Sequence, residues 1–196
     1  MDEVPVIGGG ICKHPEERFF RKCFTFFSDH GNKIMMLEQR SNAACDVIDG
    51  DTLFVCGGKD KYKIHTTSEF VSLNGISVEG PELPFPIHSH TVINFDASAI
   101  YIIGGYQSGD WSEKTWILNP SKKFELSEGP SMNIARCCHA SGKMICNGKV
   151  LLVVAGGFFE NSVEILDPNS DQGWKFGNFF LNFTRVPNLT DCFSNF

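Results

Sequence analysis

The sequence predicts an all-β protein built from repeated four-stranded units. Three observations support this: an apolar run ending in Gly-Gly recurs at nearly constant spacing, short strand-like segments and tight turns surround each run, and no unit has room for a long helix. The repeat is interpreted first, because a fixed period of this size governs how every local motif is read.

Four apolar runs end in Gly-Gly, and their first glycines are 49, 47 and 52 residues apart. The pairs are Gly8-Gly9, Gly57-Gly58, Gly104-Gly105 and Gly156-Gly157. A nucleotide loop is not favoured, because G-x-G-x-x-G and GK[ST] are missing and no helix is expected to follow the glycines. The glycines are therefore interpreted as structural turns.

Each complete unit is expected to hold four short strands. A strand and a turn precede the apolar run, and Asp49-Gly50 and Asn147-Gly148 are strong hairpin signals at such turns. A polar loop follows the Gly pair, and then come two more strands, as in "NSVEIL" and "GWKFGN". Antiparallel four-stranded sheets at this period are typical of β-propeller blades, in which the second strand is covered on both faces and is therefore continuously apolar.

The expected organisation is about three complete blades plus part of another. Residues 1–45 form the partial first blade, 46–90, 91–135 and 136–180 the complete ones, and 181–196 an atypical tail. Propellers have typically four to eight blades, so we favour a chain cut from a longer protein. The alternative is an open arc that self-associates through its uncovered edges.

The unit resembles the kelch repeat. The marks of that family in the last unit are Pro130, Met132, Arg136, Gly156-Gly157, Asp167-Pro168 and Trp174. The resemblance covers roughly residues 4–180 and is weaker in the second unit, which has no Trp. It implies a propeller of kelch repeats. It says little about function, since such propellers include binding modules and a few enzymes.

Composition narrows the function classes. The net charge of −6 and the absence of a basic run argue against nucleic acid as a partner, and the apolar runs are too short to span a membrane. No signal peptide is visible, so a cytoplasmic location is expected; an extracellular one requires that a signal peptide was lost by truncation.

The eight cysteines lack paired C-x-x-C spacing, so no metal is expected and free core thiols are favoured. The rival is a secreted, disulfide-bonded and glycosylated binding protein, consistent with sequons at Asn182 and Asn188. No catalytic residues and no cofactor are expected, because paired carboxylates and a nucleophile motif are missing. A remnant of a propeller oxidase or isomerase is kept as a further alternative.

The loops after the Gly pairs and the linkers between units are expected to share one face. Candidate partner-binding residues on it are Arg40, Lys59, Lys61, Tyr62, His88, Tyr106, Trp111, Arg136 and Phe158, with Phe159 beside the last of them. Arginine and aromatic side chains dominate binding hot spots. Trp111 is the most informative, because it lies in a polar loop, whereas Trp116 and Trp174 are expected in the core. The competing interpretation is ordinary solvated loops, with Arg40 and Arg136 making contacts inside their own blades.

The sequence therefore predicts a protein-interaction module whose partner is a protein of unknown identity. The kelch resemblance implies that the chain is part of a ubiquitin-ligase substrate adaptor or of an actin-binding cytoskeletal protein.

Overall fold

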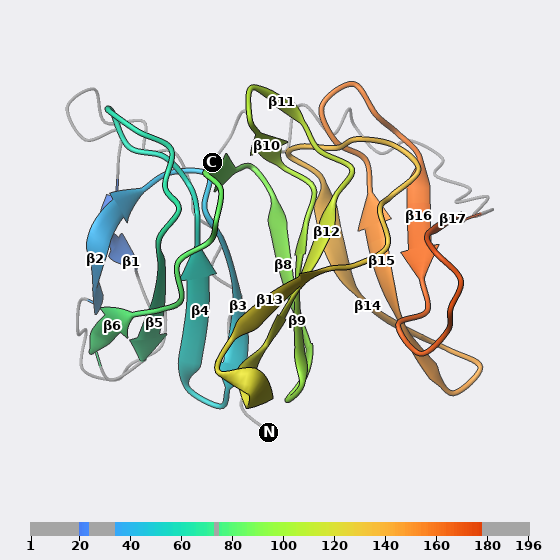
Figure 1. Cartoon of the computed structure of the whole chain (residues 1–196), viewed down its shortest axis with the longest axis horizontal. Helices are drawn as coiled ribbons and strands as arrows, with labels where there is room; N and C mark the ends of the chain where they lie inside the picture. Colours follow the sequence, from blue (N-terminus) through green and yellow to red (C-terminus); the bar gives the residue numbers. More distant parts are fainter. Residues whose placement is uncertain (1–19, 24–33, 73–74, 178–196) are drawn as a thin grey trace, which may run out of the picture.

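The computed structural model describes residues 20–23, 34–72 and 75–177, with side chains from Met36 onward. The predictions for Gly8, Gly9, Asn182, Asn188 and the tail 181–196 lie outside these ranges. Within them the chain is all-β, as predicted, and its main strands form three antiparallel four-stranded sheets (Figure 1).

The three sheets follow one another along the chain. Sheet I contains β3 (Ala44–Asp49), β4 (Thr52–Cys56), β5 (Ser68–Ser72) and β6 (Ser77–Glu79). Sheet II contains β8 (Thr91–Asp96), β9 (Ala99–Ile103), β12 (Thr115–Asn119) and β13 (Glu125–Glu128). Sheet III contains β14 (Ala140–Cys146), β15 (Lys149–Ala155), β16 (Val163–Leu166) and β17 (Lys175–Phe176). In each sheet the strands lie in chain order.

Smaller elements complete the described chain. Strands β1 (Phe20–Cys23) and β2 (Ile34–Arg40) pair with each other before sheet I. Strand β10 (Tyr106–Gln107) lies between β7 (Ile87–His88) and β11 (Asp110–Trp111) in a small three-stranded sheet. One 3₁₀ turn, Pro120–Lys122, follows β12.

The β14–β15 hairpin turn has the backbone that its sequence predicts, with φ of 50° at Asn147 and 76° at Gly148. The β3–β4 turn differs, because only Gly50 is positive, at 45°, and the register shifts between Val47 and Asp49. Asp49 and Thr52 still pair across a two-residue turn, and a bulge at Ile48 precedes that turn in sheet I.

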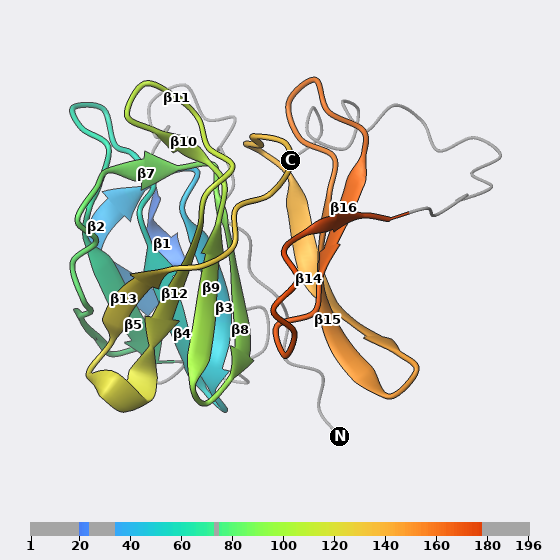
Figure 2. The same ribbon diagram turned by 45° about the vertical axis from the view of Figure 1, so that its right-hand side comes forward.

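The sheets pack face to face through their second strands (Figures 1 and 2). Phe54 of β4 shares a core cluster with Ile100 and Ile102 of β9. The next residues of β9 point the opposite way, so Tyr101 packs in a second cluster with Leu152 of β15. Because β9 is covered on both faces, its run is continuously apolar.

The Gly pairs of sheets I and II lie at the end of the second strand of each sheet. The linker that leads into the next sheet crosses the chain at this point. A Cβ on Gly57 would stand 2.5 Å from the Ile87 carbonyl oxygen, and one on Gly104 would stand 2.7 Å from that of Arg136. The same carbonyls accept hydrogen bonds from Gly58 N at 2.8 Å and Gly105 N at 2.7 Å. Glycine is needed here for this approach and for the positive φ of all four residues.

The three sheets span residues 44–79, 91–128 and 140–176. No helix among the described residues is long and apolar enough to cross a membrane.

Candidate functional site

The loops after the Gly pairs gather at one end of the molecule, the upper edge in Figure 1, and the hairpin turns lie at the other. Lys59, Tyr106 and Phe158 occupy corresponding places in these loops. Lys59 bridges to Ser41, Tyr106 pairs with His88, and Phe158 N donates to the Cys137 carbonyl at 2.9 Å. We call this end the loop end.

An aromatic cluster lies at the loop end. It consists of Trp111, Phe158 and Phe159, and the Trp111 ring meets that of Phe158 edge-on at 5.7 Å between centroids. The two Phe rings are 4.4 Å apart. Phe158 is 52% exposed and Phe159 is 90% exposed. Phe159 also has a φ of 61°, a conformation that a bulky side chain rarely adopts. The sequence indicated Phe159 only as the residue beside the candidate Phe158.

A second aromatic contact joins His88 and Tyr106, whose rings stack at 5.0 Å. The Tyr106 hydroxyl donates to the Gly109 carbonyl at 2.7 Å and so holds the β10–β11 loop. Burial, together with the Lys59 charge, lowers the pKa of His88. Its imidazole is therefore neutral at pH 7, and both rings are half-buried rather than fully presented.

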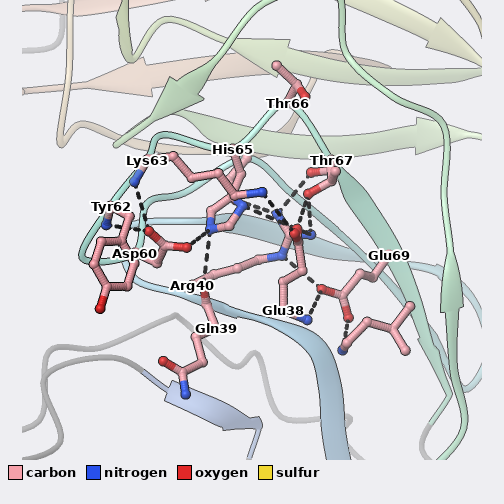
Figure 3. Close-up of polar contacts among 12 residues, drawn as sticks. Glu38, Gln39, Arg40, Asp60, Tyr62, Lys63, His65, Thr66, Thr67 and Glu69 are labelled. Carbon is pink, nitrogen blue, oxygen red and sulfur yellow. Dashed lines mark hydrogen bonds and ion pairs between the residues drawn. The ribbon is translucent and has the colours of Figure 1, made fainter.

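Lys61 and Tyr62 form the bend of a tight turn in the loop between β4 and β5. Figure 3 shows Tyr62 in this turn beside Asp60 and Lys63. The Asp60 carboxylate holds the turn by accepting from Tyr62 N at 2.6 Å and Lys63 N at 2.8 Å. Tyr62 is 86% exposed, and the Lys61 ammonium lies 5.5 Å from its ring centroid. The turn therefore presents an aromatic ring and a cation to solvent.

His65 lies buried beneath this turn, between it and β2 (Figure 3). Its Nε2 is 3.1 Å from the Gln39 carbonyl oxygen and 3.4 Å from Asp60 Oδ2. Its Nδ1 is 3.2 Å from Glu38 Oε2 but is not aligned for a hydrogen bond. Burial and the Arg40 charge lower the pKa of His65, and the two carboxylates oppose them only in part. The neutral ring supports the turn, and no sequence motif marked it.

Arg40 and Arg136 do not line the exposed surface, and the prediction for them needs correction. They are 2% and 0% exposed. Arg40 Nε donates to Glu69 at 2.9 Å and its Nη1 to the Gly57 carbonyl at 2.8 Å. Arg136 has corresponding partners: its Nη2 donates to Glu164 at 3.0 Å and its Nη1 to the Gly156 carbonyl at 2.8 Å. Each guanidinium thus joins a linker, a Gly pair and a third strand, and neither lies in a solvated loop.

The middle sheet has an apolar substitute for this ion pair. Ile87 stands at the Arg position, four residues before β8, and Trp116 stands at the Glu position of the third strand. Trp116 packs on Phe85 with centroids 4.6 Å apart. In sheet III the Asn133 N–H also donates to Glu164, at 2.7 Å, whereas the corresponding residue before sheet II is Pro84, which has no N–H. Sheet II thus lacks the arginine, the glutamate and the N–H donor that interact with one another in sheet III.

No group of three or more His, Cys, Asp and Glu residues among the described residues could hold a metal ion. Cys56, Cys137, Cys138 and Cys146 are thiols. Cys137 and Cys138 lie beside the aromatic cluster, and sequence reasoning did not single them out as a pair.

Comparison with known proteins found no match, either among protein-family models or among curated proteins.

Proposed function

We propose that this chain is a segment of a kelch-type β-propeller that binds a partner protein through its loop end. The repetition of similar sheets, with the Gly pairs of sheets I and II packed under the next linker, supports the propeller-like part of the proposal. The observation that carries the binding role is the exposed aromatic cluster of Trp111, Phe158 and Phe159.

The cluster is difficult to explain by stability alone. Phe159 keeps its ring almost fully in solvent and holds a left-handed backbone, both of which are unfavourable for an isolated chain. Trp111 and Phe158 lie beside this ring, so the three side chains offer a partner one contiguous aromatic surface. Exposed aromatics of this kind are typical of binding hot spots.

The turn that carries Lys61 and Tyr62 adds a second contact region at the same end. The network of Asp60, His65 and Glu38 fixes its base. The net charge of −6 and the mixed charges of this end favour a protein partner over nucleic acid. In the kelch family such a role includes substrate adaptors for ubiquitin ligases and actin-binding proteins.

The test compares partner recovery by three immobilised proteins: wild type, the double variant Phe158→Ser/Phe159→Ser, and Ile145→Ser. Ile145 is the matched control, because it is 78% exposed but lies beside the hairpin turn of sheet III at the opposite end. Proteins retained by wild type and Ile145→Ser, lost with the double variant, and then bound as purified proteins would support the proposal. Equal recovery by all three, with the folds intact by circular dichroism, would overturn it.

A further inference from the structure

Two adjacent thiols lie at the loop end. Cys137 is buried at 6% exposure and Cys138 is exposed, and burial together with the neighbouring Cys138 thiol raises the pKa of Cys137. The backbone on both sides is fixed: Phe158 N donates to the Cys137 carbonyl, and Cys138 N donates to the Ser89 carbonyl, each at 2.9 Å. The pair is therefore held in place from both neighbouring segments.

The fold itself does not require thiols at these positions. The corresponding residues are Ser41-Asn42 before sheet I and His88-Ser89 before sheet II. Asn42, Ser89 and Cys138 share a φ between 55° and 57°, so three different side chains satisfy the same backbone. The backbone of the repeat therefore does not explain why two cysteines stand next to each other in the linker before sheet III.

We propose that Cys137 and Cys138 form a vicinal dithiol site that binds a thiophilic, three-coordinate group of the trivalent arsenic class. An aryl arsenic(III) oxide would form two As–S bonds here. The two S–H bonds and the As–O bond break, the two protons leave with the oxide oxygen as water, and arsenic keeps its oxidation state. A single exposed thiol makes one such bond, whereas a pair makes a chelate that is far harder to displace.

The burial pattern suggests an order of events. Cys138 is accessible and forms the first bond, and Cys137 closes the ring from within. Burial raises the pKa of Cys137 to about 11, so its thiol is protonated at pH 7 and loses its proton to the oxide oxygen as the second As–S bond forms. The carbonyl of Cys137 holds Phe158, which contacts Trp111, and closure is therefore expected to change the environment of Trp111. This site does not depend on the proposed partner binding.

The experiment uses the full, reduced chain and phenylarsine oxide as the probe. The folded protein is treated with one equivalent, and excess 2-mercaptoethanol then strips adducts held by single thiols. After the remaining free thiols are alkylated, trypsin cuts at Arg136 and Lys143 and releases CCHASGK, while Cys146 leaves in MICNGK. We expect the retained adduct on CCHASGK, its release by 2,3-dimercaptopropanol, and a change in Trp emission that Trp111→Phe removes.

Three variants complete the test. Cys137→Ser and Cys138→Ser should each lose the retained adduct, and Cys146→Ser, whose thiol is exposed at the far hairpin, should keep it. The internal comparison is the peptide of residues 41–59, which holds both Cys45 and the buried Cys56. An adduct on that peptide instead, an adduct that either serine variant keeps, or none on the folded protein would overturn the proposal.

Discussion

Arg136 is a buried charged residue whose side chain links separate segments of the fold. Its guanidinium donates to the carbonyls of Gly156 and Ser162 and pairs with Glu164, so the buried charge is fully engaged by acceptors. A buried pair of this kind gives little net stability compared with a well-packed apolar pair, and sheet II uses the apolar pair instead. Removing only one member is different, because it leaves the other charge buried alone.

Replacing Glu164 by Ala is therefore predicted to destabilise the protein strongly. It orphans the Arg136 guanidinium and the N–H groups of Asn133 and Ile134, and we expect a loss of about 3–5 kcal/mol in the free energy of unfolding. Urea unfolding measures it. The control is Lys149→Ala, which breaks a solvent-exposed ion pair with Asp167 and should leave the urea midpoint close to wild type. Equal midpoints for the two variants would contradict the prediction.

His90 and His139 make the protein sensitive to mild acid. Burial lowers the pKa of His90 to about 3 and that of His139 to about 4, and each ring lies against the Gly pair of the preceding sheet. Below the unfolded pKa of 6.5 the unfolded chain binds protons that the folded chain excludes. Their contribution is thus present at pH 8 and is lost as the pH falls.

The expected loss at pH 5 relative to pH 8 is about 2 kcal/mol for each ring. The stability profile between pH 8 and pH 5, measured by urea unfolding, should become flatter in His139→Gln. Carboxylates with lowered pKa, such as Asp167, begin to lose their contribution only near pH 5 and therefore add little to the change between pH 8 and pH 5. An unchanged slope in His139→Gln would show that this ring does not titrate in the assumed way.

At the scale of the element, the Gly pairs combine two demands, backbone conformation and space. Gly104 and Gly156 allow the two demands to be measured separately. Their backbone conformations are similar, with φ values of 61° and 67°, so the two residues differ mainly in the space around a Cβ atom. A Cβ on Gly104 would lie 2.7 Å from the Arg136 carbonyl oxygen, whereas the nearest atom for Gly156 is Glu160 O at 3.6 Å.

Gly156→Ala should therefore cost only the left-handed backbone, about 1–2 kcal/mol. Gly104→Ala should cost a further 1–3 kcal/mol, roughly, because the next linker must move away from sheet II. Thermal or urea unfolding of the two variants gives the difference directly. Equal losses would mean that the linker yields without cost and that the glycine is needed for φ alone.

These elements also show how far the sequence could be read. The Gly spacing and the apolar runs predicted the sheets, because burial on both faces and a close crossing restrict the residue types strongly. The sequence did not determine whether Arg136 is exposed or buried. An arginine before a strand suits an exposed loop as well as a buried contact, and its partner Glu164 is distant in sequence. His65 escaped for the same reason, since its support comes from β2.

At the scale of the whole molecule, the two internal interfaces are built alike. The third residue before each Gly pair is Phe54 in sheet I and Tyr101 in sheet II, and both are buried against the next sheet. In sheet III the same position is Val153, and it is only half-buried. Leu152 and Val154 face sheet II, so Leu151, Val153 and Ile165 form an apolar face that no described strand covers.

We predict that two copies of the chain associate through this face, because a flat apolar sheet surface of this kind is unfavourable in water. Wild type should show a mass that rises with concentration in sedimentation velocity or light scattering. Val153→Lys should remain a monomer at the same concentrations, since a charge at the centre of the face prevents its dehydration. Ile145→Lys, on the opposite face of sheet III and already exposed, should behave like wild type. A monomeric wild type at every concentration, or a folded Val153→Lys protein that still associates, would rule out this face as the contact.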